Sequence, residues 1–161
     1  MLLKIGFTSN NGCDFPAAVE RAWKSGIINL STVSATDLRY GYFIYPVDFK
    51  VGGQEFLTAA QLPLVDIMYT LSLSVRDLGS NGSAEIDFTE NSYVIRIKLQ
   101  DSRVKFTPSH GAGAVAPECD LAEYVSEVQE FVTSGISHLV GGYPVFEDNR
   151  VIDEMKELAE M

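Results

Sequence analysis

The sequence offers few side chains for nucleophilic or imidazole chemistry: two cysteines, Cys13 and Cys119, and two histidines, His110 and His138. His110 is expected on a loop, where it could act as a base for either cysteine. His138 falls near the end of a predicted long helix, a position where histidine commonly serves the helix terminus without a catalytic role. No spacing in the chain brings a base to a nucleophile. The sequence therefore favours a protein that is not an enzyme.

The sequence also predicts no metal ion and no cofactor. It contains no CxxC, no HExxH and no calcium-binding loop. The segment Gly111–Gly113 precedes a predicted helix as a phosphate-binding loop does, but it lacks the Gly-Lys-Ser/Thr that follows in such loops. Among 22 acidic residues, no two are marked as a catalytic carboxylate pair. Both cysteines are expected to be free thiols.

The negative charge is concentrated at one end of the chain. Of the formal net charge of −10, the segment from Pro117 to Met161 carries −9, because it has eleven acids against the two bases Arg150 and Lys156. Such one-sided charge favours a basic partner and argues against direct binding of nucleic acids or anionic membranes. The candidate partner-binding residues are Glu118, Asp120, Glu123, Glu127, Glu130, Glu147, Asp148, Glu154 and Glu157.

Apolar residues recur at helical spacing in residues 62–78 and again in residues 121–140. Glu118 and Asp120 are expected in the first turn of the second helix, where the helix dipole stabilises carboxylates. That helix carries an acidic stripe with no lysine or arginine at neighbouring positions, which is more typical of a solvated face than of a metal site. The stripe consists of Glu123, Glu127 and Glu130.

Two shorter helices have predicted caps. Asp14 is expected to cap a helix that ends near Gly26, and Asp148 or Asn149 is expected to cap a final helix after residue 149.

Alternating apolar residues predict strands. They occur in residues 2–7, in residues 42–51 with a glycine hairpin leading into residues 54–58, and in three runs between residues 84 and 106. The three runs predict a meander, because turns this short join adjacent antiparallel strands. On its outward side Glu85 and Asp87 should lie beside Arg96 and Lys98, which is typical of a solvated face. An alternative is a basic patch that docks an anion and also includes Arg103 and Lys105.

These elements predict an α+β fold, in which an antiparallel meander sheet has two or three helices packed mainly on one face. One globular domain over residues 1–161 is the simplest organisation, since no polar linker divides the chain. The sequence has no run of apolar residues long enough to span a membrane and no secretory signal pattern. We therefore expect a cytoplasmic protein.

The order of these elements resembles that of small bacterial immunity proteins of polymorphic toxin systems. The resemblance is carried by Tyr42–Thr58, Leu64–Leu78, Ala84–Phe106 and Leu121–Val140. It implies a protein without catalytic residues that binds a toxin, commonly a basic nuclease, and covers or distorts its active site. The acids of the C-terminal segment would then take the place of the phosphate-bearing substrate.

Three hypotheses follow from the sequence. The first is an acidic binding protein that neutralises or regulates a basic protein partner. The second is a small enzyme that uses His110, Cys119 or a pair of acids. The third is a structural or homo-oligomerising unit, whose acidity serves only solubility.

Overall fold

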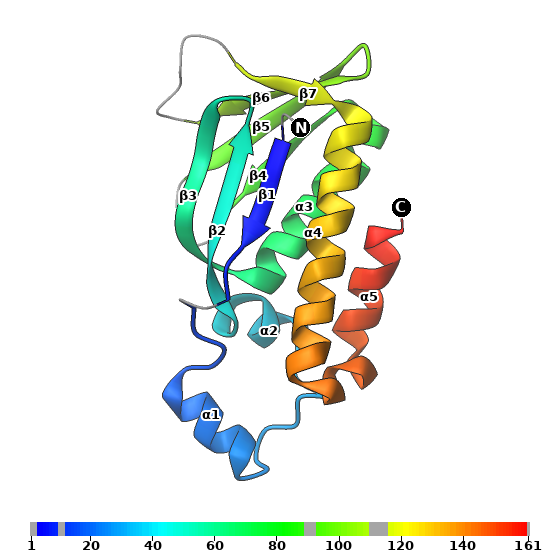
Figure 1. Ribbon diagram of the computed structural model, residues 1–161. Coiled ribbons are helices and arrows are strands. Elements are labelled where there is room, and N and C mark those ends of the chain that lie inside the picture. Colours follow the sequence, from blue (N-terminus) through cyan, green and yellow to red (C-terminus); the bar gives the residue numbers. More distant parts are fainter. Residues whose placement is uncertain (1–2, 10–11, 89–92, 110–115, 161) are drawn as a thin grey trace.

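The computed structural model describes residues 3–9, 12–88, 93–109 and 116–160, and it has the expected α+β fold (Figure 1). Two antiparallel sheets are present, and helices pack against them. The first sheet consists of β1 (Leu3–Phe7), β2 (Ile44–Val51) and β3 (Gln54–Pro63), in that order. The second sheet consists of β4 (Ser83–Asp87), β5 (Val94–Gln100), β6 (Arg103–Pro108) and β7 (Glu118–Asp120), also in chain order.

The α-helices in the described residues are α1 (Ala17–Lys24), α2 (Ala35–Gly41), α3 (Leu64–Asn81), α4 (Leu121–Gly142) and α5 (Arg150–Ala159), with a short 3-10 helix η1 (Pro144–Asp148) before α5. In Figure 1, α4 runs between β1 on one side and α5 on the other, and it contacts both. α1 stands apart at the end of the molecule where α4 terminates, and none of its residues is buried.

The two sheets share one hydrophobic core. Phe106 of β6 contacts Phe49 of β2 and Phe56 of β3 at ring-centroid distances of 5.9 and 6.1 Å. Tyr124 of α4 closes this cluster from the helical side, 5.7 Å from Phe106, and its hydroxyl lies 2.5 Å from Ser74 Oγ of α3. The sheets and the two long helices therefore bury their apolar faces against each other.

Several elements confirm the sequence predictions. α3 follows Pro63, and α4 runs slightly past the expected end at Val140. The hairpin β2–β3 turns at Gly52, whose positive φ of 60° favours glycine. β4, β5 and β6 form the expected meander. Asn149 caps α5, because its Oδ1 accepts a hydrogen bond from the Val151 N–H at 2.8 Å.

The expected position of Glu118 and Asp120 in the first turn of α4 is wrong. Both lie in β7, where they are exposed on either side of the buried Cys119. This short strand pairs with β6, so its backbone groups bond to the sheet and α4 starts only at Leu121. A strand of three residues is too short for its alternation to be recognised in the sequence.

Two further predictions about the N-terminal part of the chain differ from the structure. Asp14 does not cap α1, which starts after Pro16 without a side-chain cap. The other difference is α2, which was not predicted and whose N-cap Ser34 accepts a hydrogen bond from the Asp37 N–H at 3.2 Å. This helix is short and buries only Leu38, so it has no apolar stripe to signal it.

His110, most of the small-residue loop at residues 111–116 and the turn at residues 89–92 lie outside the described residues. Among the helices that the structure does describe, none combines the length and hydropathy that a membrane span requires.

Candidate functional site

The structure places the nine predicted binding residues on three parts of the surface. The first is β7, where Glu118 and Asp120 face the basic residues of β6. Asp120 pairs with Arg103 at 2.8 Å, and Glu118 lies across the strand pair from Lys105. These two acids have cationic neighbours in the sheet, so they add little net negative potential at that edge.

The second part is the flank of α4 beside β1, which carries Glu123, Glu127 and Glu130. Glu123 is turned toward β1, where its Oε1 accepts a hydrogen bond from the Leu3 N–H at 3.1 Å. Glu127 is half-buried and Glu130 is exposed, and within the described residues neither forms an ion pair. Glu127 and Glu130 are therefore the two residues of the predicted stripe that lie outside the ion pairs of the described residues.

The third part is η1 with α5, on the other side of α4. Glu147 pairs with Lys156 at 2.8 Å. Glu154 accepts a hydrogen bond from the Tyr69 hydroxyl at 3.0 Å and lies 3.8 Å from Arg150. Asp148 and Glu157 are exposed and form no ion pair in the part of the chain that the structure describes. The nine acids are therefore distributed over β7, α4, and η1 with α5.

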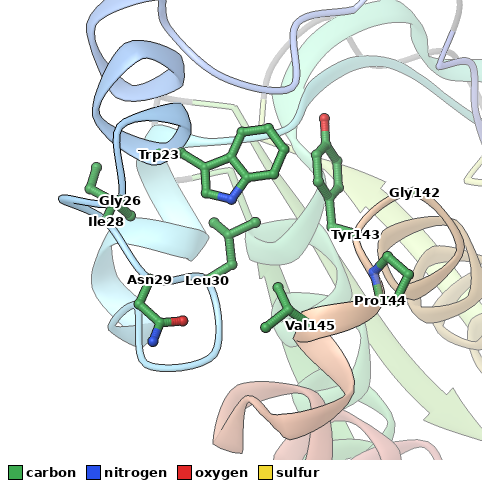
Figure 2. A pocket seen from close by; sticks show the side chains of 9 residues that line it. All are labelled: Trp23, Gly26, Ile28, Asn29, Leu30, Gly142, Tyr143, Pro144 and Val145. Carbon is green, nitrogen blue, oxygen red and sulfur yellow. The ribbon is translucent and has the colours of Figure 1, made fainter.

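A groove that the sequence analysis missed lies where α1, the loop after it and η1 meet (Figure 2). We call it the α1–η1 groove. Its volume is about 550 Å³, and Trp23, Leu30, Tyr143 and Val145 lie around it. The other lining residues are Gly26, Ile28, Asn29, Gly142 and Pro144. Its large side chains are almost all apolar, and they come from segments more than a hundred residues apart.

Aromatic packing and one buried amide hold the groove together. Phe15 contacts Trp23 at 5.5 Å and Tyr143 at 5.1 Å between ring centroids. The Asn149 side chain, 1% exposed, donates hydrogen bonds to the carbonyl oxygens of Leu30 and Val33 at 2.8 and 3.2 Å. Because Asn149 also caps α5, it ties the loop after α1 to the helical end of the molecule.

A polar network lies behind the groove. The Tyr143 hydroxyl donates to Asp14 Oδ2 at 2.7 Å, and the Tyr45 hydroxyl donates to Asp14 Oδ1. Nε2 of His138 lies 3.0 Å from the Tyr45 hydroxyl oxygen. Burial, followed by the hydrogen bond that each hydroxyl donates to Asp14 and the charge of that carboxylate, raises the pKa of Tyr45 and of Tyr143 well above the ordinary value. Asp14 thus connects the segment between β1 and α1 to Tyr45 of β2 and to Tyr143 at the end of α4.

The cysteines and histidines considered for catalysis have different surroundings. Cys119 is buried, and desolvation raises the pKa of its thiol to about 12, so the reactive thiolate is suppressed. Cys13 is exposed, and its Sγ donates to the Phe15 carbonyl at 3.0 Å. His138 directs Nε2 to Tyr45, as described above. Both cysteines are free thiols.

Comparisons with known proteins do not extend this picture: no protein-family model, no curated protein and no solved structure matches the chain. What the structure establishes is the fold class: the protein is α+β, with helices packed against antiparallel sheets.

Proposed function

We propose that this protein is a non-catalytic binding protein of the cytoplasm, which neutralises or regulates a basic protein partner through the flank of α4. In its most specific form, the proposal is an immunity-like inhibitor of a basic nuclease toxin. The observation that carries it is the pair Glu127 and Glu130, which lie on a long helix and form no ion pair in the described residues.

The proposal is supported by the way the other acids are used. Asp120, Glu147 and Glu154 have cationic neighbours, and Glu123 binds the backbone of β1. Carboxylates without an ion-pair partner raise the rate of encounter with a cationic surface. This increase becomes smaller as salt screens the charges.

The test is capture of partners by the tagged protein from a lysate of the cells that produce it, with the captured protein identified by mass spectrometry. We expect a basic protein whose capture weakens about tenfold when both Glu127 and Glu130 are replaced by lysine, and which is also lost as the ionic strength rises. Asp153→Lys with Glu157→Lys is the matched control, since it makes the same charge change on the exposed side of α5. Equal capture by the wild type and the α4 variant, or equal loss in the control, would contradict the proposal.

A further inference from the structure

We propose that the α1–η1 groove is the anchor site of this docking surface and receives an apolar side chain that is flanked by lysine or arginine on the basic partner. The inference rests on the proposed function, and it adds the chemistry of the residue that the partner must insert.

Exposed apolar side chains lie at the groove. Among the described residues, the large hydrophobic side chains that stand exposed are Ile27, at 81%, and Val145, at 38%. Val145 lines the groove, and Ile27 lies between the lining residues Gly26 and Ile28. Exposed apolar residues gathered around a concave apolar surface typically mark an interaction site. Their coincidence at one groove indicates that a partner covers it.

The size and construction of the groove also support the inference. Its volume of about 550 Å³ lies within the range of pockets that enclose a small ligand or a large side chain. Trp23 and Tyr143 form one wall with ring centroids 5.3 Å apart, and tryptophan and tyrosine dominate binding energy at protein interfaces. Asn149 and Phe15 hold the walls in place before binding, which lowers the entropic cost of association.

The charges near the groove indicate which kind of side chain binds there. Asp14 lies against the Tyr143 hydroxyl at 2.7 Å, and the charge of Glu20 also acts on Tyr143. On the opposite rim, Asp148 follows Val145 by three residues in η1, and residues at that spacing share a face in a 3-10 helix. Lys24 offsets part of this charge through its 3.0 Å pair with Glu20. The carboxylates that remain are Asp14, behind the groove, and Asp148, on the η1 side. Their charge suits an apolar side chain with cationic neighbours.

The same charges disfavour a second copy of this chain as the occupant. Each copy carries a net charge of −10, and the carboxylates near one groove would face those of the other molecule. Like charges brought together at an interface cost free energy and slow association.

The acidic flank and the groove share one helix, because Gly142, the last residue of α4, lines the groove. Residues 127, 130, 134, 138 and 141 recur at steps of three and four, so they follow one side of the helix down to the groove-lining Gly142. The rise of an α-helix places Glu127 about 22 Å from Gly142. A single partner can span that distance within an interface of ordinary size.

The experiment uses Trp23 as the reporter, because it is the single tryptophan of the chain. The probes are short synthetic peptides with one leucine, isoleucine or phenylalanine between lysines, titrated into the full-length protein. We expect a saturable shift of the tryptophan emission to shorter wavelength. The dissociation constant should rise at least about tenfold when the apolar residue is changed to serine, when the lysines are changed to glutamate, or in Val145→Asp.

Ile27→Ser is the second variant, and Asp153→Lys, at an exposed residue of α5, is the control that should leave the titration unchanged. Both Ile27 and Val145 are exposed in the structure, so circular dichroism should show the same fold in all variants. The inference is overturned if no peptide gives a saturable response, or if serine peptides or Val145→Asp respond like their parents. It is also overturned if sedimentation shows a dimer that Val145→Asp dissociates, because a second copy would then occupy the groove.

Capture from the lysate separates this inference from the proposed function. If the variant with Glu127→Lys and Glu130→Lys loses a basic partner while Val145→Asp keeps it, the proposed function stands and the groove is not its anchor. If the peptides bind at Trp23 but the captured protein is not basic, the groove binds the proposed kind of side chain and the proposed function is wrong.

Discussion

The outer face of the β4–β7 sheet and the flank of α4 are both charged, but their carboxylates have different neighbours. On the sheet, Glu85 lies opposite Arg96 at 3.3 Å and Asp120 pairs with Arg103 at 2.8 Å. On α4, Glu127 and Glu130 have no such pair in the described residues. The number of acidic residues in a segment therefore says little about function by itself. The basic residues that the fold places beside them must also be known.

The largest expected effect comes from a carboxylate that is both paired and buried. Asp66 of α3 is 1% exposed, and Arg39 Nε lies 2.5 Å from its Oδ1. Arg39→Ala leaves this charge in the core, and we expect the free energy of unfolding, measured by urea denaturation, to fall by about 3 kcal/mol. Arg39→Lys should recover part of the loss. A loss no larger than that of the exposed Arg96→Ala would remove the distinction between buried and surface pairs.

The second effect concerns carboxylates that accept hydrogen bonds from phenols, at Asp14 and Glu154. Burial and the hydrogen bond to Glu154 raise the pKa of Tyr69 to about 12. The folded state holds these phenol protons more tightly than the unfolded chain does. Their contribution to the free energy of unfolding is therefore fully present below pH 10 and is lost as the pH rises from 10 to 12. Urea denaturation over this range should show the decline, and Tyr69→Phe should make it shallower. A flat profile would contradict the prediction.

Exposed pairs on the sheet should matter less. Arg103→Ala breaks the pair with Asp120 at the edge of the second sheet, where both side chains are largely exposed. We expect a small loss, again from urea denaturation, because solvent screens such pairs. Arg96→Ala provides an independent second case. A loss as large as that of Arg39→Ala would mean that these surface pairs behave like the buried one.

The smallest effect on stability is expected on the flank of α4, and its sign should be reversed. Glu127→Gln removes repulsion from Glu123 and Glu130, so the free energy of unfolding should rise by about 0.2–0.5 kcal/mol. A thermal melt at low ionic strength is the measurement, and the gain should shrink as salt is added. Destabilisation by Glu127→Gln would show that this carboxylate has a structural partner and would weaken the contrast with the sheet.

The thiols give a simple check of the same packing. Cys13 is exposed, whereas Cys119 is buried and has a pKa of about 12. Treatment of the native protein with iodoacetamide near neutral pH should therefore modify Cys13 and spare Cys119, as peptide mass spectrometry would show. Modification of Cys119 at an equal rate would indicate that β7 opens readily from β6.

The fold class and most of the long elements could be predicted from the sequence, because their periods are local properties. The stripe of α3 and the alternation of β5 follow from the spacing of apolar residues alone. β7 and α2 escaped because a strand of three residues and a helix with one buried residue carry too little periodicity. Asp14 was assigned to a cap, since the two tyrosines that bind it come from distant segments.

The candidate site was predicted only in part. The acidic stripe of α4 was visible as a pattern, but the sequence could not show that Asp120, Glu147 and Glu154 have cationic neighbours. The α1–η1 groove was not predicted, because Trp23 and Val145 are each unremarkable where they stand in the chain. The exposure of Ile27 next to them is a property of the folded surface.

By itself the sequence determined the acidity of the C-terminal segment, the periods of the helices and strands, and the glycine turn at Gly52. These depend on residue type and short-range geometry. Which carboxylates lie beside a cation, which phenol hydroxyls donate to Asp14, and where apolar side chains stay exposed around Trp23 depend on the folded arrangement. Those outcomes depend on contacts between segments far apart in the chain, which no local pattern encodes.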